Sequence, residues 1–209
     1  RLYTNAANTA TRLARYNGLA AEPLYHPPRL AERIGGGPYG EYVLSVGRLE
    51  TVKRIDLLIR AIAHTPPTLH LVVVGEGTQR ENLERLVEEL SLGDRIRFAG
   101  AVDDDALIRL YAGARAVAYA PFDEDFGYVT LEAFLARKPV VTARDSGGTL
   151  EFVQDGLNGF VCEPEPEAIG LALADLAVDA GRAASLGEAG YERARLVTWD
   201  GVVQKLVGA

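Results

Sequence analysis

The sequence predicts an α/β fold built on a doubly wound, mostly parallel Rossmann-like sheet. Three observations support this prediction. Short apolar runs that end near glycine or proline recur along the chain, and such runs are typical of buried parallel strands. Helical patterns separate the runs, and the alternation continues through most of the sequence. We therefore expect parallel strands joined by right-handed crossover connections.

The expected strands are six apolar runs. They cover residues 42–46, 69–74, 95–98, 116–119, 139–142 and 159–161. Gly47 and Gly75 directly follow the first two runs, and Gly100 lies just after the third. Because glycine lets the chain turn sharply, these residues are expected to mark the ends of their strands.

The expected helices place apolar side chains three and four residues apart. Residues 55–62, 83–90 and 107–111 each follow this spacing. Asp103, Asp104 and Asp105 open the third helix. Carboxylates at this position cap free amide groups and face the positive end of the helix dipole. We therefore interpret the three aspartates as capping residues and not as a metal site.

The first part of the chain differs from the alternating middle. Residues 1–4 predict the end of a strand, Asn5 a helix cap, and residues 7–16 a helix that Gly18 closes. The glycines and proline of residues 35–38 then predict a linker. Residues 1–37 are therefore expected to be the tail of another domain with its linker.

The last part of the chain is expected to be helical. After Pro166, helical patterns cover residues 167–176, 181–195 and 198–207. The resulting division assigns residues 38–178 to the sheet domain and residues 179–209 to C-terminal helices.

Composition narrows the classes of function. The 209 residues are 48% hydrophobic, which suffices for one sizeable core. A net charge of −7 and a pI near 5.1 argue against nucleic acid or an anionic membrane as the partner. Cys162 is the only cysteine, and no apolar run approaches the roughly 20 residues that span a bilayer. We expect a cytoplasmic protein and, because no methionine is present, a fragment of a longer chain.

The first candidate site lies where the first expected strand meets the next helix. Gly47 and Arg48 end the strand, and Lys53 precedes the helix. Ligands of doubly wound sheets bind at this edge, and glycine lets the backbone approach them closely. Arg48 offers a planar fork for phosphate oxygens, and Lys53 adds a mobile charge. The pattern predicts a diphosphate site, although a solvated basic loop explains the same residues without a ligand.

The second candidate site contains two glutamates. Glu124 lies in the loop after a strand, and Glu132 lies on a helix that begins near Gly127. Free amides at a helix start bind anions, and a carboxylate beside them accepts hydrogen bonds from sugar or ribose hydroxyls. The alternative is a pair of surface glutamates near a helix start, where the dipole favours them.

Three further signals are weaker. Gly147 and Gly148 permit close backbone approach but also suit a tight turn, and Glu151 fits a structural cap better than a catalyst. Residues 75–77 form only part of a dinucleotide fingerprint, because the third glycine is missing. The histidines lack partners at metal-ligand spacing. We therefore expect neither a metal nor a cofactor.

The ordered set of motifs resembles the carboxyl-terminal domain of GT-B retaining glycosyltransferases of family four, the glycosyl transferases group 1. The resemblance runs from about Tyr42 to about Ala177. It rests on Val46-Gly47-Arg48-Leu49 with Lys53, Val73-Val74-Gly75-Glu76-Gly77, Phe98-Ala99-Gly100, Glu124-Asp125-Phe126-Gly127 with Leu131-Glu132-Ala133, Lys138-Pro139-Val140-Val141, and Gly147-Gly148 with Glu151, Gly156 and Gly159. Each motif alone is weak, but the ordered set is highly specific.

The resemblance implies a site for a nucleoside diphosphate sugar. Arg48 and Lys53 would bind the diphosphate, Glu124 the hydroxyls of the transferred sugar, and Glu132 the ribose. The other implied binding residues are Gly47 and Gly75, Gly100 and Val102 beside the base, and the backbone of Phe126, Gly127, Tyr128 and Val129 around sugar and phosphate. The implied catalytic residues are Arg48, Lys53 and Glu124, with Glu124 positioning the sugar and not acting as a nucleophile. The family usually needs no metal, because cations and the helix dipole take the charge of the leaving diphosphate.

The sequence departs from the family pattern at single positions and in extent. Arg54, Asp125 and Arg137 replace common glycines, and Tyr128 replaces a smaller aliphatic residue. The resemblance also implies an amino-terminal acceptor domain, of which residues 1–37 would be a remnant. The isolated chain is therefore expected to bind the donor but to transfer almost no sugar.

The acceptor would be a saccharide, a lipid or a small molecule, and any peripheral membrane contact would come through the missing domain. Two other functions fit the same residues: a non-catalytic nucleotide-sugar-binding module, and a nucleotide-sugar epimerase of related fold. The presence of both Glu124 and Glu132 favours transfer.

Overall fold

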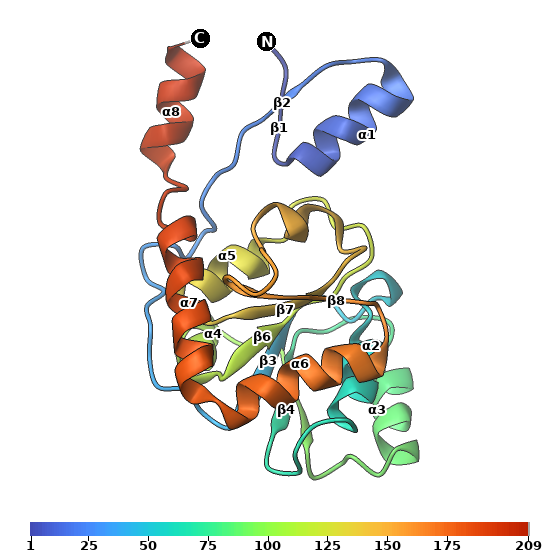
Figure 1. The fold of residues 1–209 in the computed structure, drawn as a ribbon. Helices are drawn as coiled ribbons and strands as arrows, with labels where there is room; N and C mark the ends of the chain where they lie inside the picture. The colour runs from blue at the N-terminus through green and yellow to red at the C-terminus, as the bar shows by residue number, and fades with distance from the viewer. Residues whose placement is uncertain (209) are drawn as a thin grey trace.

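A computed structural model describes residues 1–208 and confirms the predicted α/β architecture. Six parallel strands form the main sheet in the order β5-β4-β3-β6-β7-β8 (Figure 1). The strands are β3 (Tyr42–Val46), β4 (His70–Val74), β5 (Ile96–Gly100), β6 (Ala116–Ala118), β7 (Val140–Ala143) and β8 (Gly159–Cys162). Their bounds agree with the predicted runs to within about two residues. The strand order reverses between β3 and β6.

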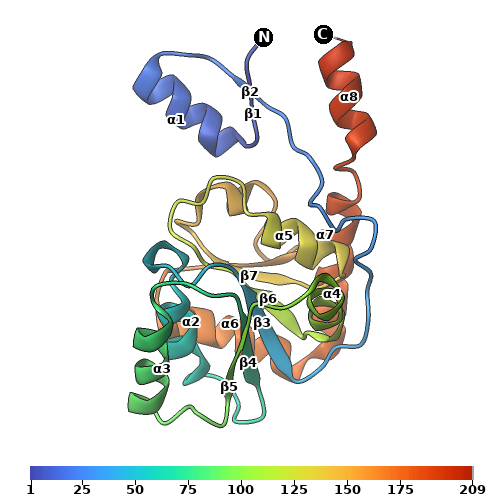
Figure 2. The same ribbon diagram turned by 180° about the vertical axis from the view of Figure 1, so that it is seen from behind.

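Helices cover both faces of this sheet (Figures 1 and 2). The helices of the main domain are α2 (Ile55–Ile62), α3 (Arg80–Glu89), α4 (Asp104–Gly113), α5 (Tyr128–Leu135), α6 (Pro166–Val178) and α7 (Ala180–Ala194). Buried residues of α2, α3 and α6 form one core, and those of α4 and α5 form the other. Leu186 of α7 joins the first core and Ala194 the second. The helix α7 therefore packs against both layers.

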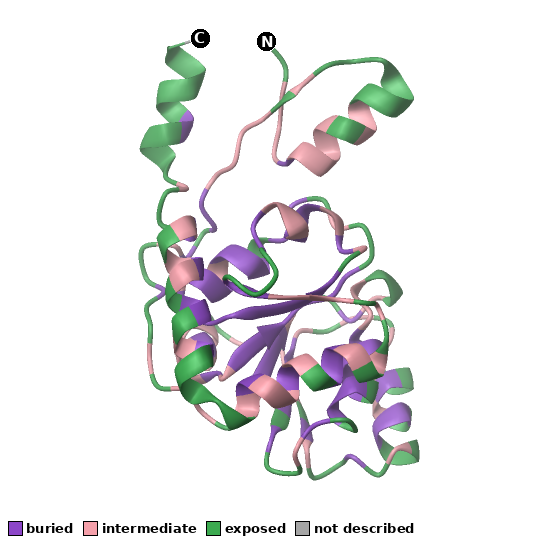
Figure 3. Cartoon of the chain, viewed as in Figure 1, coloured by how far each residue is buried: buried purple, intermediate pink, exposed green. Residues whose placement is uncertain are grey.

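The four central strands β4, β3, β6 and β7 are buried on both faces, which explains their continuous apolar runs. Successive side chains alternate between the two cores. Val43 and Leu71 point to the core under α2, whereas Leu44 and Val72 point to the core under α5. Figure 3 shows the central strands of the main sheet mostly in the colour of buried residues and β8 mostly in the colour of intermediate ones.

The two ends of the chain lie at the same end of the molecule (Figures 1 and 2). These outer elements are β1 (Tyr3–Thr4), α1 (Ala7–Asn17), β2 (Glu22–Pro23) and α8 (Trp199–Val207). β1 and β2 form a small parallel sheet of their own, and Lys205 Nζ of α8 donates to Pro23 O at 2.8 Å. Gly18 closes α1 with φ +66°, as predicted. The prediction that Asn5 caps α1 is wrong, because the cap residue is Ala6, whose side chain has no oxygen.

The linker between the outer segment and the sheet is held by specific contacts. Arg29 makes a two-pronged contact with Asp104 at 2.7 and 2.6 Å. The buried Lys138 donates to Gly37 O and Pro38 O, both at 2.9 Å, and burial lowers its pKa to about 8. Side chains of the main domain therefore fix the path of the glycine-rich segment. Within residues 1–208, no helix is both long and apolar enough to cross a bilayer.

Candidate functional site

The candidate site lies at the carboxyl ends of β3 and β6, where the strand order reverses. Doubly wound sheets bind ligands at this point, because the loops that follow the two strands diverge to opposite faces. A cavity of about 340 Å³ opens here. It is lined by Asn5, Gly47, Arg48, Lys53, Tyr119, Glu124, Asp125, Phe126, Gly127, Tyr128 and Val129. The structure thus brings together most of the predicted site residues and adds Asn5, Tyr119 and Asp125.

Two larger cavities lie elsewhere. One of about 670 Å³ lies beside the edge strand β5, and one of about 660 Å³ lies between the linker and the helices α7 and α8. Neither lies at the strand reversal or contains the predicted cation and carboxylate pair. Of these three cavities, the 340 Å³ cavity is therefore the candidate on chemical grounds and not on size.

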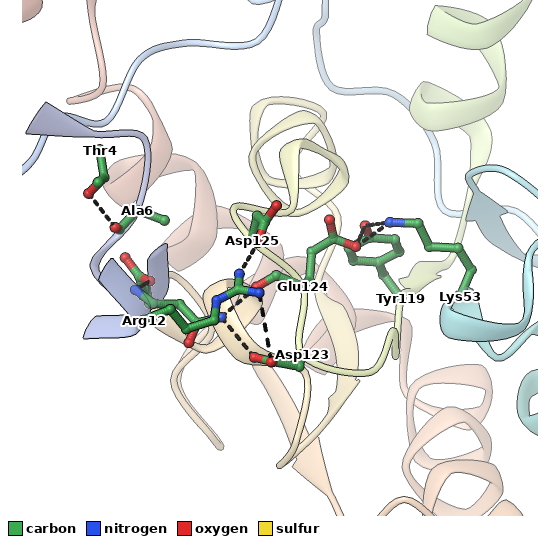
Figure 4. Close-up of polar contacts among 10 residues, drawn as sticks. Thr4, Ala6, Arg12, Lys53, Tyr119, Asp123, Glu124 and Asp125 are labelled. Atoms are coloured by element: carbon green, nitrogen blue, oxygen red, sulfur yellow. Dashed lines mark hydrogen bonds and ion pairs between the residues drawn. The ribbon is translucent and has the colours of Figure 1, made fainter. Parts of the chain in front are cut away.

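A cation and a carboxylate from the two strand ends meet in this cavity. Lys53 ends a short 3-10 helix, η1 (Thr51–Lys53), and its Nζ pairs with the carboxylate of Glu124 (Figure 4). Tyr119 donates its hydroxyl to Glu124 Oε2 at 2.8 Å. The side chains of Lys53 and Glu124 are 14% and 18% exposed, so both are partly shielded from water. Burial, and then the neighbouring Glu124, raise the pKa of Tyr119, which therefore stays a neutral hydrogen-bond donor.

Close backbone contacts position the loop that carries Arg48. Gly47 N donates to Val74 O at 3.0 Å. Gly75 has φ +129°, and a Cβ atom there would lie 2.0 Å from Gly47 O. Only glycine fits such a contact. The amide of Gly75 donates in turn to Gly100 O at 2.9 Å. Gly75 and Gly100 therefore support the cavity-lining loop without themselves lining the cavity.

The start of α5 presents unpaired amide groups. Gly127 is the cap residue and adopts a left-handed conformation with φ +75°. Among residues 1–208, the amides of Gly127, Tyr128 and Val129 donate to no protein acceptor. Phe126 as a whole residue is only 2% exposed, so it leaves almost no surface for a ligand. The amides and the helix dipole together favour an anion in the cavity.

The remaining predicted residues have different surroundings. Arg48 is exposed and lines the cavity. Glu132 is half-buried on α5, and Tyr111 donates its hydroxyl to Glu132 Oε2 at 2.7 Å. Burial raises the pKa of Glu132, and the Tyr111 hydrogen bond opposes this shift in part. Val102 packs against the core under α5. Neither Glu132 nor Val102 lines the 340 Å³ cavity.

Glu151 caps a helix that lies far from it in the sequence. Its carboxylate accepts hydrogen bonds from Ala7 N at 2.8 Å, from Asn8 N at 2.7 Å and from the Tyr25 hydroxyl at 2.7 Å. The two amides belong to the first turn of α1, whose own cap residue has no side-chain oxygen. The predicted role of Glu151 as a structural cap is therefore confirmed, and the helix that it caps is α1.

Two arginines of the main domain adopt left-handed backbone conformations. Arg54 has φ +50° and Arg137 has φ +57°. Arg54 contacts both carboxylate oxygens of Asp145, at 2.8 and 2.7 Å, and donates to Ala120 O at 2.7 Å. The guanidinium of Arg137 lies 3.8 Å from the centre of the Tyr191 ring. These contacts offset the steric cost of a side chain in a conformation that suits glycine.

Sequence reasoning missed three residues that line the cavity. Tyr119 ended an apolar run and looked like a strand residue, although its place just before Pro121 at a strand end was a usable signal. Asp125 was noted only as a departure from the family pattern. Asn5 carried no signal for this site, because its position depends on how the outer segment docks. Within the described part of the chain, no three His, Cys, Asp or Glu side chains gather as a metal site requires.

Comparison with known proteins identifies the family. The family described as glycosyl transferases group 1 matches residues 37–193. The chain belongs to this family. It is 36% identical to the D-inositol 3-phosphate glycosyltransferase of Salinispora tropica, over 85% of the chain and 40% of that protein. It is 30% identical to the human alpha-1,3/1,6-mannosyltransferase ALG2, over 73% of the chain and 40% of that protein. The chain thus spans 40% of the length of these two curated relatives.

Two solved structures share the fold of this group 1 chain. The Anabaena Alr3699/HepE structure in complex with UDP and glucose matches with a TM-score of 0.90 and 24% identity, covering 99% of the chain and 61% of that protein. The sucrose-phosphate synthase of Thermosynechococcus elongatus matches with a TM-score of 0.81 and 26% identity, covering 99% and 56%. The family and the GT-B Rossmann-like fold predicted from the motifs are both confirmed.

Proposed function

We propose that this chain is the donor-binding half of a retaining glycosyltransferase, which moves a sugar from a nucleoside diphosphate to an acceptor. The observation that supports this most strongly is the cavity in which Lys53 meets Glu124 beside the free amides of α5. A diphosphate requires positive charge, and a sugar requires acceptors for its hydroxyl groups. The cavity offers both the positive charge and the hydrogen-bond acceptors.

The diphosphate is the part of the donor that fits the cationic side of the cavity. Arg48 is exposed and offers two parallel donors, Lys53 offers a point charge, and the amides of Gly127 and Tyr128 point from the helix start. Each charge-assisted hydrogen bond contributes about 1.5–3 kcal/mol. The same groups stabilise the charge that develops on the leaving diphosphate, so the proposed mechanism is independent of a metal.

Lys53 and Glu124 exchange partners when the donor binds. Without a donor, the two charges neutralise each other, and both side chains are largely shielded from water. With a donor, Lys53 faces the diphosphate, and the carboxylate of Glu124 accepts hydrogen bonds from the sugar hydroxyls. The Tyr119 hydroxyl keeps the carboxylate oriented. The cation also offsets the repulsion between this carboxylate and the phosphate charge.

Glu124 acts by positioning in this proposal. Its Oε2 atom is engaged by both Lys53 and Tyr119, which suits an acceptor of hydrogen bonds better than an attacking group. The retaining outcome is taken from the motif resemblance, in which the acceptor attacks from the face that the diphosphate leaves. The oxygen of the acceptor hydroxyl forms the new bond to the sugar carbon as the bond to the diphosphate oxygen breaks, and the hydroxyl proton passes to that leaving oxygen.

The nucleoside is assigned to the far side of the same sheet edge. Glu132 is proposed to bind the ribose through the carboxylate oxygen that Tyr111 leaves free. The loop from Gly100 to Val102 is proposed to lie against the base, because it follows β5 at the same edge.

The acceptor side is proposed to come from the rest of a longer protein. The longer lengths of the curated relatives support this, since the chain spans 40% of the first of them. Residues 1–37 are assigned to that acceptor part and its linker, residues 38–178 to the donor domain, and residues 179–209 to the helices that complete it. A cytoplasmic location belongs to the same proposal and is supported by the single cysteine.

A calorimetric titration tests the proposal. The chain is titrated with UDP, GDP and ADP, and with UDP-glucose, GDP-mannose and ADP-glucose, in the presence of a metal chelator. At least one pair should bind. The Arg48→Ala variant should bind this pair more weakly, by about 1.5–3 kcal/mol in binding free energy. Arg60 is exposed and lies outside the cavity, so Arg60→Ala should bind as the parent does. Failure of all six compounds to bind, or equal binding by the Arg48→Ala variant, would contradict the proposal.

A further inference from the structure

The loop that carries Glu124 is also held by α1, away from the Lys53 and Tyr119 contacts of the Glu124 side chain. The Asn8 side-chain amide donates to Glu124 O at 2.9 Å and to Asp123 Oδ1 at 3.0 Å. Arg12 pairs with the carboxylate of Asp125 and lies 3.9 Å from that of Asp123. In Figure 4, the Arg12 side chain reaches Asp123 and Asp125 while the Glu124 side chain points the other way, toward Lys53 and Tyr119.

The sequence explains why one helix face reaches all three loop residues. Asn8 and Arg12 are four residues apart on α1 and therefore share a face. Asp123 and Asp125 flank Glu124, and their side chains contact Asn8 and Arg12 of α1, while the Glu124 side chain contacts Lys53 and Tyr119. The cap that Glu151 places on the first turn of α1 fixes this helix against the same part of the main domain.

The loop backbone needs such support. Asp123 has φ +46°, a left-handed conformation that Asp adopts more readily than most non-glycine residues when its side chain is hydrogen-bonded. Residues in such conformations persist where their surroundings determine them. Three hydrogen bonds surround it here. The Asn8 side chain donates to the Asp123 side chain, and the Asp123 amide donates to Asp145 O at 2.9 Å. The Gly148 amide donates to Glu124 O at 2.7 Å.

We propose that the β1–α1 segment is a positioning element of the donor site, in which Asn8 and Arg12 hold loop 123–125 so that Glu124 faces the sugar. This inference rests on the proposed role of Glu124. The Arg12 pairs are exposed, with side chains of Arg12, Asp123 and Asp125 at 36%, 45% and 61%, so they contribute little to global stability. Their effect lies in the position of the loop. Recognition of the sugar, and not of the diphosphate, should therefore depend on α1.

The test compares affinity for a nucleoside diphosphate with affinity for its sugar conjugate. UDP with UDP-glucose, GDP with GDP-mannose and ADP with ADP-glucose are titrated into the parent chain, and the pair that binds is used for the variants. Asn8→Asp and Arg12→Ala should weaken the sugar conjugate by about three- to tenfold and leave the plain diphosphate within about twofold. Arg15→Ala, an exposed arginine on the same helix, should match the parent. The exchange of Arg12→Asp with Asp125→Arg should restore affinity for the sugar conjugate.

Equal losses for both ligands, or none for either, would overturn the inference. Hydrogen exchange of the ligand-free chain supplies a second measurement that needs no donor. The Gly148 amide should exchange faster in Asn8→Asp than in the parent. Its exchange rate in Arg15→Ala should equal that of the parent. Unchanged exchange in Asn8→Asp would also overturn the inference. If the parent binds none of the compounds, the proposed function fails, and this exchange measurement still decides whether α1 holds the loop.

Discussion

Replacing Gly75 by alanine tests the close packing that supports the cavity. The added Cβ would lie 2.0 Å from Gly47 O, and the backbone φ of +129° suits glycine only. Overpacking costs about 1–3 kcal/mol, and the strained backbone adds about 1–3 kcal/mol. We therefore expect a loss of about 2–6 kcal/mol in the free energy of unfolding. For a chain of this size, that lowers the melting temperature by roughly 4–24 °C.

Two other glycines provide matched controls for this variant. A Cβ at Gly93 would meet no atom within 4 Å, so Gly93→Ala should stay within about 0.5 kcal/mol of the parent. A Cβ at Gly159 would lie 2.0 Å from Val140 O, outside the cavity lining. Gly159→Ala should therefore lose stability as Gly75→Ala does but keep its nucleotide affinity. Gly75→Ala should also bind nucleotide more weakly, because the loop of Gly47 and Arg48 must move.

Thermal unfolding followed by circular dichroism, together with calorimetric titration well below the melting temperature, measures both effects. A melting temperature of Gly75→Ala within about 2 °C of the parent corresponds to a loss of less than about 1 kcal/mol in the free energy of unfolding. Such a result would refute the packing argument. Equal loss of nucleotide affinity in Gly75→Ala and Gly159→Ala would refute the link between this contact and the site.

The remaining predictions concern stability. Glu151→Ala should lower the free energy of unfolding in urea by about 1–3 kcal/mol, because α1 loses its cap. Glu88 is exposed, so Glu88→Ala should stay within about 0.5 kcal/mol of the parent. Similar losses in both variants would reject the cap. Burial raises the pKa of Glu132 from 4.5, so its contribution to stability is present below that pH and lost as the pH rises through the raised pKa. Glu132→Gln should reduce this decline as the pH rises above 4.5, and an unchanged profile would reject the assignment. Arg54→Gly relieves a left-handed residue but leaves Asp145 unpaired, so a net loss of stability is expected in urea unfolding, and a gain would mean that the strain outweighs the ion pair.

The fold of the main domain was predictable because its signals are local. Strands buried on both faces give continuous apolar runs, and glycine marks where they end, as at Gly47 and Gly75. The place of the site followed from the same reasoning, since loops after parallel strands meet at one edge. The residues alone left Arg48 with Lys53 and Glu124 with Glu132 as two candidate sites, and only the resemblance of the ordered motifs implied one donor site for them.

The contacts across the outer segment were not predictable, because they join residues far apart in the sequence. Nothing near Asn5 indicates that Ala6 is the cap residue or that Glu151 supplies the capping oxygens. The ion pair of Lys53 with Glu124 likewise depends on the register of two strands and on a short 3-10 helix. Such contacts are set by how whole elements dock, and the hydrophobic pattern carries no record of them.

The central claim is that Lys53 recognises the diphosphate and Glu124 the sugar of one donor. The most direct measurement is the ratio of two dissociation constants, for a nucleoside diphosphate and for its sugar conjugate, in Glu124→Ala and Lys53→Ala. Glu124→Ala should bind the plain diphosphate as well as the parent or better, because Lys53 is released from its ion pair. The affinity of this variant for the sugar conjugate, divided by its affinity for the plain diphosphate, should fall about tenfold from the parent value. Lys53→Ala should weaken both ligands alike. An unchanged ratio in Glu124→Ala would contradict the account.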